Sequence, residues 1–293
     1  MTIIVGLVYK DGVIIASDSQ STMNRGAPVK RLNQTKIYEL KNTSLQVVIG
    51  GAGTVPIISK VIEYIQQKVK NKPDSKISEM LSYAENAMIS VTRWYNFDRL
   101  KELNPVSPPN NITVENNEKP LNKSIQLQQQ VQLQPIDVIL LVGGIDEDKN
   151  PFLNIVLNEG IAERQEKYGA IGSGAAYAEY IVSQLFIEKM TDRQAIKIAA
   201  HTIEQVKKID PHVGGDVQIV NISLKRKIDT FKKTQIDKIC GDVGQIQNAV
   251  AYIWQCYLND DFEELTKPLF NKPKVNTKQK LIDVKQKQSN ILS

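Results

Sequence analysis

The sequence is poor in the features that define several large classes of protein. No apolar run approaches the roughly 20 residues that cross a bilayer, so we expect no membrane span. Lys10 and Asp11 interrupt the apolar N-terminal stretch before the centre of a signal peptide could form. The two cysteines, Cys240 and Cys256, are too few for a disulfide framework or a zinc site. These absences favour the reducing cytoplasm.

Basic charge is confined to the C-terminal end of the chain. The 293 residues carry a net charge of +5, but the segment from Lys267 onward holds seven lysines and a single acid, Asp283. The remaining 30 basic and 31 acidic residues nearly cancel. The basic isoelectric point is therefore a property of the tail, and it does not indicate a nucleic-acid-binding fold.

The first two dozen residues form the most informative segment. Two short apolar runs, Ile3–Val8 and Val13–Ala16, lie on either side of the turn dipeptide Asp11-Gly12, a pattern that predicts a β-hairpin. The second run ends at Asp18, and a hairpin returns this carboxylate to the beginning of the first strand. We therefore expect Asp18 to lie near Thr2.

Thr2 follows the initiator methionine directly. Methionine is removed before small residues, which would leave Thr2 with a free α-amino group. Such an amine titrates near pH 8, far below a lysine side chain, and an adjacent amine can activate a threonine hydroxyl as a nucleophile. The segment could therefore supply an activated threonine nucleophile, although a threonine after the initiator methionine is common and by itself indicates no function.

TIIVG and ASDSQST resemble the opening of proteasome β-type subunits, which include bacterial relatives that work with an ATPase ring. Those proteins begin at a catalytic threonine, followed by a similar strand and an A-x-D-x-x-x-T element. The resemblance continues in order to about residue 224. It implies an α+β fold, a four-layer α-β-β-α sandwich of two antiparallel sheets of the N-terminal-nucleophile hydrolase type.

Segments further along the chain contain other residues that match the family pattern. A short strand at Lys36–Leu40 is followed by the strand Leu45–Ile49 and by glycines whose backbone N–H groups can face an oxyanion. Each of these motifs alone is weak evidence for an active site, because a glycine-rich junction between a strand and a helix is more often a packing device. The resemblance makes Lys36 the lysine near the nucleophile and the Gly50 N–H the oxyanion donor. One departure is a loop before Lys36 that is about two residues longer than is usual in the family.

Two helices, Val55–Lys70 and Lys76–Tyr95, are predicted by helical spacing of apolar residues. The strands Ile136–Val142 and Phe152–Leu157 are expected to pair, and Tyr168–Ile171 leads into Gly172-Ser173-Gly174 and a helix from Ala175 to about Lys189. A further helix runs from Thr191-Asp192 to Ile209, followed by a strand at Val217–Leu224. We treat His201 and His212 as incidental.

By the resemblance, Ser173 and Asp210 order the terminal amine. Val213 stands where the family usually has a serine, and this departure puts the complete hydrogen-bond network around the amine in question. No metal or cofactor is needed for this chemistry.

Two segments fall outside the family pattern. Residues 104–135 are asparagine-, proline- and glutamine-rich, with too little apolar content for a core. We interpret them as an insertion within a domain spanning residues 1–225; a domain boundary is the alternative. Residues 226–293 form a C-terminal extension in which Gln245–Leu258 is expected to be a helix, with Ile246, Val250, Ile253 and Trp254 on one face. Beyond Pro268 the chain is rich in lysine and glutamine and is expected to be disordered.

The resulting hypothesis is a threonine endopeptidase in a ring-shaped compartmental protease. Its partners would be unfolded proteins or peptides, copies of itself or related ring subunits, and an ATPase unfoldase ring, with no nucleic acid and no membrane. Carried over from the resemblance, Ser21, Gln34, Val48 and Ala52 line the specificity pocket, which would favour apolar residues. Two alternatives remain: a non-catalytic ring subunit, supported by Val213, and a related hydrolase of small amides.

Overall fold

The computed structural model describes residues 2–24, 28–31, 33–40, 45–95, 137–225 and 227–258. The predicted insertion at 104–135 and the chain beyond Leu258 lie outside the described residues. The chain divides into two units, Met1–Cys240 and Gly241–Ser293. The first unit contains two five-stranded sheets, a two-stranded sheet and the candidate site.

The predicted N-terminal hairpin is the centre of the first sheet. β1 (Ile3–Tyr9) and β2 (Gly12–Asp18) pair antiparallel around Asp11-Gly12. A Cβ at Gly12 would lie 2.0 Å from the carbonyl oxygen of Ile222, so the turn passes too close to the neighbouring strand for a side chain. The sheet has the order β10-β1-β2-β11-β12, with β10 at Tyr168–Gly172, β11 at Val217–Ser223 and β12 at Lys227–Thr230.

The second sheet is also antiparallel and has five strands in sequence order. Its two long strands, β6 and β7, are rich in β-branched residues and almost entirely buried, as expected for strands covered on both faces. The strands are β5 (Ile37–Glu39), β6 (Gln46–Gly53), β7 (Val138–Ile145), β8 (Pro151–Val156) and β9 (Ala162–Arg164).

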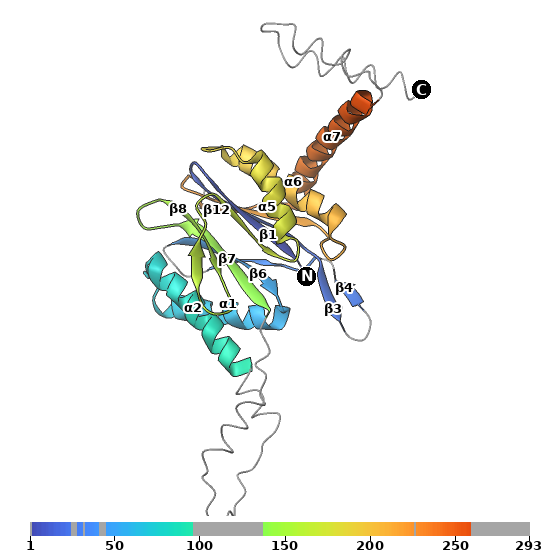
Figure 1. Cartoon of the computed structure of the whole chain (residues 1–293). Helices are drawn as coiled ribbons and strands as arrows, with labels where there is room; N and C mark the ends of the chain where they lie inside the picture. Colours follow the sequence, from blue (N-terminus) through green and yellow to red (C-terminus); the bar gives the residue numbers. More distant parts are fainter. Residues whose placement is uncertain are drawn as a thin grey trace, which may run out of the picture. The chain divides into compact units, whose positions relative to one another are not determined.

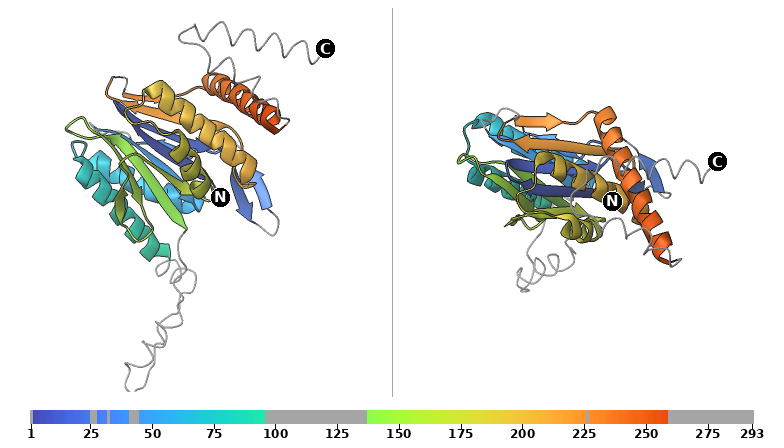
Figure 2. Two further views of the ribbon diagram at one scale, coloured as in Figure 1. Left: turned by 45° about the horizontal axis from the view of Figure 1, so that its top comes forward. Right: turned by 90° about the horizontal axis from the view of Figure 1, so that it is seen from above.

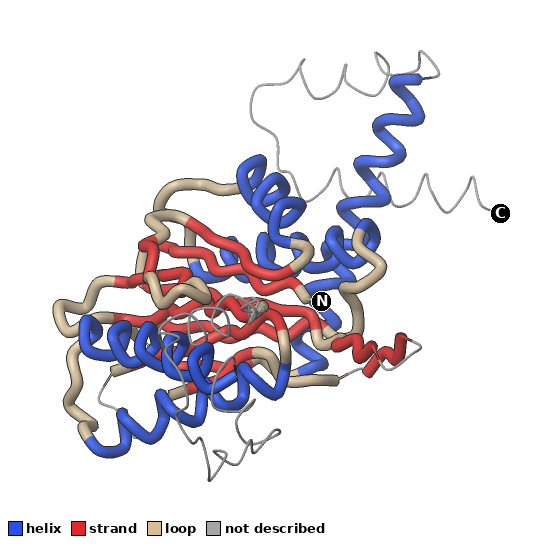
Figure 3. Tube along the Cα trace, turned by 60° about the horizontal axis from the view of Figure 1, so that its bottom comes forward, coloured by secondary structure: helices blue, strands red, loops and turns tan. Residues whose placement is uncertain are grey.

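A pair of helices covers the outer face of each sheet (Figures 1 and 2). α1 (Val55–Asn71) and α2 (Ile77–Arg93) pack on the second sheet, and α5 (Ala175–Leu185) and α6 (Asp192–Ile209) pack on the first. α6 begins with a capping box, in which the Thr191 hydroxyl accepts from the Gln194 N–H and the Gln194 side chain accepts from the Thr191 N–H. The expected four-layer sandwich is therefore confirmed, and Figure 3 shows its strands between the helical layers.

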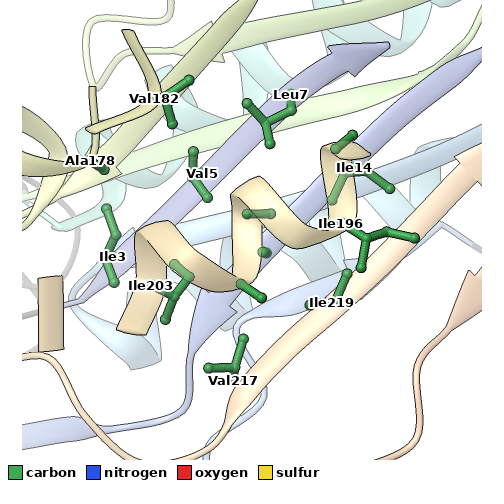
Figure 4. Close-up of a cluster of buried hydrophobic side chains, with 14 of the residues drawn as sticks. Ile3, Val5, Leu7, Ile14, Ala178, Val182, Ile196, Ile203, Val217 and Ile219 are labelled. Atoms are coloured by element: carbon green, nitrogen blue, oxygen red, sulfur yellow. The ribbon is translucent and has the colours of Figure 1, made fainter. Parts of the chain in front are cut away.

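Three apolar clusters fill the spaces between the layers. One lies between the first sheet and α5 and α6, where Ile3, Val5 and Leu7 meet Ile203 and its neighbours (Figure 4). A second lies between the second sheet and α1 and α2. The third, which includes Ile4, Ile15 and Leu141, joins the two sheets to each other. Alternate residues of β1 and β2 thus serve two different cores.

Several short elements differ from the sequence-based expectations. The segment expected to be a loop before Lys36 contains the hairpin of β3 (Ser21–Asn24) and β4 (Pro28–Arg31). α5 ends at Leu185, before the expected Lys189, because Phe186 adopts an extended conformation. Beyond residue 225, β12 adds a strand to the first sheet. No helix within the described ranges is long and apolar enough to span a membrane.

The last helix, α7, spans Lys233–Leu258 and therefore begins twelve residues before the predicted Gln245. Ile236, near its beginning, belongs to the core beneath α6. The two-unit division at Cys240 thus falls inside α7. The proposed boundary at residue 225 remains a prediction.

Candidate active site

Thr2, Asp18 and Lys36 meet in the first unit, although they come from three strands or strand ends. Thr2 precedes β1 and Asp18 ends β2, and the register of the hairpin, in which Ile4 pairs with Ser17, brings Asp18 beside the beginning of β1. Lys36 immediately precedes β5 of the second sheet. The Thr2 hydroxyl donates to Asp18 Oδ1 at 2.8 Å, and Lys36 Nζ contacts both Thr2 Oγ1 and Asp18 Oδ1. The predicted trio is therefore assembled.

Asp18 is fully buried, and five donors converge on its carboxylate. Oδ1 accepts from the Thr2 hydroxyl, from the Ile3 N–H at 3.1 Å and from Lys36 Nζ at 2.5 Å. Oδ2 accepts from the Gln20 N–H at 3.2 Å and the Gly214 N–H at 3.0 Å. The backbone donors fix the orientation of the carboxylate, so that Oδ1 faces the threonine and the lysine.

Lys36 is the charged group nearest the Thr2 hydroxyl in the described structure, and its side chain is 8% exposed. Burial lowers the pKa of Lys36 below its usual value, although the Asp18 carboxylate acts in the opposite direction. A cation at this place favours the alkoxide form of a bound hydroxyl, and a lysine of lowered pKa also loses its proton more readily. The geometry therefore suits activation of Thr2 Oγ1.

The main chain of Thr2 is fixed by the last residue of β10, Gly172, and by Ser173, which follows it. Gly172 has φ +99°, and a Cβ there would lie 2.2 Å from the Thr2 carbonyl oxygen. The Ser173 hydroxyl donates to that carbonyl at 3.4 Å and to Asp210 Oδ2 at 2.8 Å. The structure thus brings the two residues predicted to order the amine, Ser173 and Asp210, into contact with each other beside Thr2.

Val213 takes the place of the expected serine without opening a gap. It is 4% exposed and packs in the core beneath α6, with its side chain against Gly174. The adjacent Gly214 N–H reaches Asp18, and Gly215, at φ +73°, adopts the left-handed conformation that favours glycine. The loop therefore contacts the site through its backbone, whereas the Val213 side chain supplies no hydrogen bond.

The Gly50 N–H has a different environment from the one expected of an oxyanion donor. The neighbouring Gly51 N–H donates to the Lys36 carbonyl oxygen at 3.0 Å, on the β5 side of β6. Because hydrogen-bonding directions alternate along a strand, the Gly50 N–H faces β7, where Leu141 is its register partner. Its role as the oxyanion donor remains a prediction.

Of the four residues predicted to line the specificity pocket, Val48 alone lines the cavity that lies nearby. Val48 and Ala52 belong to the core between the sheets and are 0% and 3% exposed. Val48 also lines a cavity of about 360 Å³ together with Ser19 and Gln218; Ser21, Gln34 and Ala52 are not among its lining residues. The assignment of the pocket remains a prediction.

Sequence reasoning missed the backbone donors to Asp18. The Gln20 and Gly214 N–H groups carry no residue-type signal, because any residue other than proline has an N–H. The one indication was the Gly214-Gly215 pair, which permits a close backbone approach. Among the described residues there is no cluster of three or more histidine, cysteine or acidic side chains that could hold a metal ion.

Comparison with known proteins agrees with this geometry. The family model described as "Proteasome subunit" matches residues 2–91 and 110–222, which include every residue of the candidate site. The chain belongs to the proteasome subunit family. Its relatives place it among the β-type subunits.

These relationships are distant but extend over about three quarters or more of each chain. The proteasome subunit beta 1 of Pyrobaculum calidifontis is 24% identical over 238 residues, 80% of this chain and 94% of its own. The proteasome subunit beta 2 of Pyrococcus abyssi is 26% identical over 222 residues, 76% and 86% of the respective chains. Among solved structures, the ancestral beta-subunit Anbu from Yersinia bercovieri aligns with 85% of this chain and 96% of its own, with a TM-score of 0.61 and 12% identity. This last similarity supports the fold alone.

Proposed function

We propose that this proteasome-family subunit is a threonine endopeptidase that acts within a ring-shaped compartmental protease. The observation that supports it best is the shared contact of Thr2 Oγ1 with the Asp18 carboxylate and with Lys36 Nζ in a buried site. An incidental threonine does not need a fully buried ion pair against its hydroxyl.

In the proposed reaction, Thr2 Oγ1 attacks the carbonyl carbon of the scissile peptide bond. Removal of Met1 would leave a free α-amine on Thr2, which accepts the hydroxyl proton and then delivers it to the leaving amine. Lys36 stabilises the developing negative charge, Asp18 holds Lys36 and the hydroxyl, and Ser173 and Asp210 orient the amine. Water then hydrolyses the threonyl ester.

The proposed oxyanion contact requires a backbone N–H that faces the substrate. The resemblance assigns it to the Gly50 N–H, which must turn from β7 toward the substrate to serve it. An oxyanion donor acts only if it lies about 2.7–3.1 Å from the developing charge. A covalent complex with a peptide inhibitor would locate the donor directly.

Ring assembly follows from family membership, because proteasome subunits form rings with related subunits. We extend the proposal to homo-oligomeric rings in the cytoplasm that degrade unfolded proteins supplied by an ATPase ring. A closed chamber would restrict access to a threonine whose chemistry is otherwise unselective. Sedimentation showing only monomer at micromolar concentration would reject this part of the proposal.

The test of the chemistry is the state and reactivity of Thr2. Intact-mass measurement is expected to show loss of Met1, and a threonine-directed peptide epoxyketone is expected to add covalently to Thr2. Thr2→Ala removes the nucleophile, so peptidase activity should fall on the order of 10⁶-fold with folding unchanged. Thr2→Ser is the matched control, since it keeps a hydroxyl and should retain activity and labelling.

Val213 supports a second candidate, a ring subunit without peptidase activity. A missing serine hydroxyl near the terminal amine weakens the network that would hold the base. Retention of Met1 in the purified protein, with no epoxyketone adduct, would favour this candidate. Ordinary peptidase activity in Thr2→Ala would instead reject the threonine mechanism.

A further inference from the structure

A regular apolar stripe runs along α7, far in sequence from the candidate active site. Its members recur alternately three and four residues apart, which is the 3.5-residue period of a coiled-coil seam. All are β-branched, and they are Ile236, Ile239, Val243, Ile246, Val250 and Ile253. A core-facing helix of a single subunit does not require so strict a period, because its contacts follow the shape of one sheet.

The two halves of this stripe have opposite environments. Ile236 and Val243 are 4% and 5% exposed, and Ile239 packs against the core beneath α6. Ile246, Val250 and Ile253 are 60%, 48% and 42% exposed. Ile236 and Ile239 thus belong to the core of the first unit, whereas Ile246, Val250 and Ile253 in the second unit are largely open to solvent.

The charges on this part of α7 restrict what can cover it. Between Gly241 and Leu258 the only charged residue is Asp242, and there is no lysine or arginine. A helix that binds a membrane surface or a nucleic acid carries basic residues on its polar face. The polar face here is formed by uncharged residues such as Asn248 and Gln255, which makes both of those occupants unsuitable.

The positions that flank the stripe argue for an identical partner. In coiled coils, charged residues beside the seam select a different partner or an orientation. Beside the exposed part of the stripe the flanking residues Gln247, Ala249 and Trp254 are uncharged, and the one charged residue of the segment, Asp242, flanks the buried Val243. A β-branched seam without a charge pattern is complementary to a second copy of itself, as an isologous contact requires.

We propose that α7, from Gly241 to Leu258, pairs through Ile246, Val250 and Ile253 with the same segment of a second copy of this chain. The contact is small, because three stripe residues per copy fall well below the roughly 20–30 residues on each side of a standard interface. It therefore acts together with other subunit contacts, whose linkage raises the effective concentration of the two helices. To that extent the inference rests on the proposed ring.

Two matched variants of the full chain test the pairing. Ile246→Asp with Ile253→Asp places two charges on the stripe, and Asn248→Asp with Gln255→Asp places the same charges two residues further on, on the opposite face. Assembly is followed by sedimentation over a range of concentrations. We expect the stripe variant to raise the half-assembly concentration about tenfold or more, since a charge buried in an apolar contact costs at least ~1.4 kcal/mol. The control should assemble like the wild type.

Disulfide formation supplies an independent measurement. Val250 lies near the middle of the segment, so it faces its own copy whether the two helices run parallel or antiparallel. In a chain with Cys240 and Cys256 replaced by alanine, Val250→Cys is expected to cross-link under mild oxidation at least about tenfold faster than Asn248→Cys, because a disulfide requires Cα atoms within about 7 Å.

The outcomes separate this inference from the proposed function. If the stripe variant assembles like its control, or if both cysteines cross-link equally slowly, the pairing is wrong even where wild-type rings and Thr2 labelling are intact. If the wild type is a dimer that the stripe variant converts to monomer, the pairing is supported and the ring is rejected. A wild type that stays monomeric rejects both, while labelling of Thr2 still reports on the chemistry.

Discussion

Asp18→Asn tests the buried ion pair that joins the two sheets at the candidate site. The substitution keeps the size of the side chain, but it removes the negative charge opposite Lys36 Nζ and places an amide among five donors. Lys36 is then left buried without its counter-charge. Breaking a buried ion pair on one side costs about 3–5 kcal/mol, a large part of the 5–15 kcal/mol that is usual for a folded domain.

Lys36 can reduce this cost by releasing its proton, and this gives the variant a characteristic pH dependence. Burial already lowers the pKa of Lys36 below its usual 10.5, and Asp18 is the group that opposes this shift. Asp18→Asn should therefore lower the pKa of Lys36 further. Between the folded and the unfolded pKa the unfolded chain binds more protons, so stability rises with pH in that window. The window begins at lower pH in the variant than in the wild type.

The assay is thermal and urea unfolding of both proteins at several pH values between 6 and 9. At neutral pH the variant should melt roughly 6–20 °C below the wild type, and the difference should shrink as pH rises. Glu79→Gln is the matched control, because Glu79 and Lys72 form an ion pair with the same 2.5 Å separation at the surface; its melting temperature should change little. A loss in Asp18→Asn no larger than in Glu79→Gln, with no added pH dependence, would refute the buried pair.

Three further predictions concern the surroundings of Thr2. Gly172→Ala should lower the melting temperature and peptidase activity together, because its methyl group would meet the Thr2 carbonyl oxygen in a left-handed backbone conformation; a variant with wild-type activity would contradict this placement. Val213→Ser should raise the peptidase rate, measured as kcat on a fluorogenic peptide, if a hydroxyl completes the network at the amine, and an unchanged kcat would show that Asp210 and Ser173 suffice. Because Val48 and Ala52 are apolar, a peptide panel should show fastest cleavage after apolar residues, and best cleavage after arginine or glutamate would reject the assigned pocket.

Local chemistry made much of the sandwich predictable. Asp11-Gly12 between two apolar runs identified the central hairpin, and apolar residues at helical spacing identified α1 and α2 with boundaries within two residues at each end. β12 was not predicted, because Lys227–Thr230 has no apolar alternation and becomes a strand only by pairing with β11. The short β3–β4 hairpin was missed for the same reason.

The candidate site was harder to predict, because several of its contacts depend on how the two sheets pack and on strand register. The approach of Asp18 to Thr2 followed from the hairpin, whereas the position of Lys36 depended on how two sheets pack together. The direction of the Gly50 N–H depended on whether odd or even residues of β6 face β5. A shift of one residue in register reverses that direction, and no property of the glycine itself reveals it.

The ion pair between Lys36 and Asp18 joins one sheet to the other. Thr2 and Asp18 belong to the hairpin of one layer, and Lys36 leads into the edge strand of the opposite layer. Each sheet shares an apolar core with its own helices, and a third core lies between the two sheets. Only docking brings the ammonium group to the threonine. In the proposed mechanism, activation of Thr2 therefore depends on the docking of the two sheets, because only docking brings Lys36 to the Thr2 hydroxyl and to Asp18.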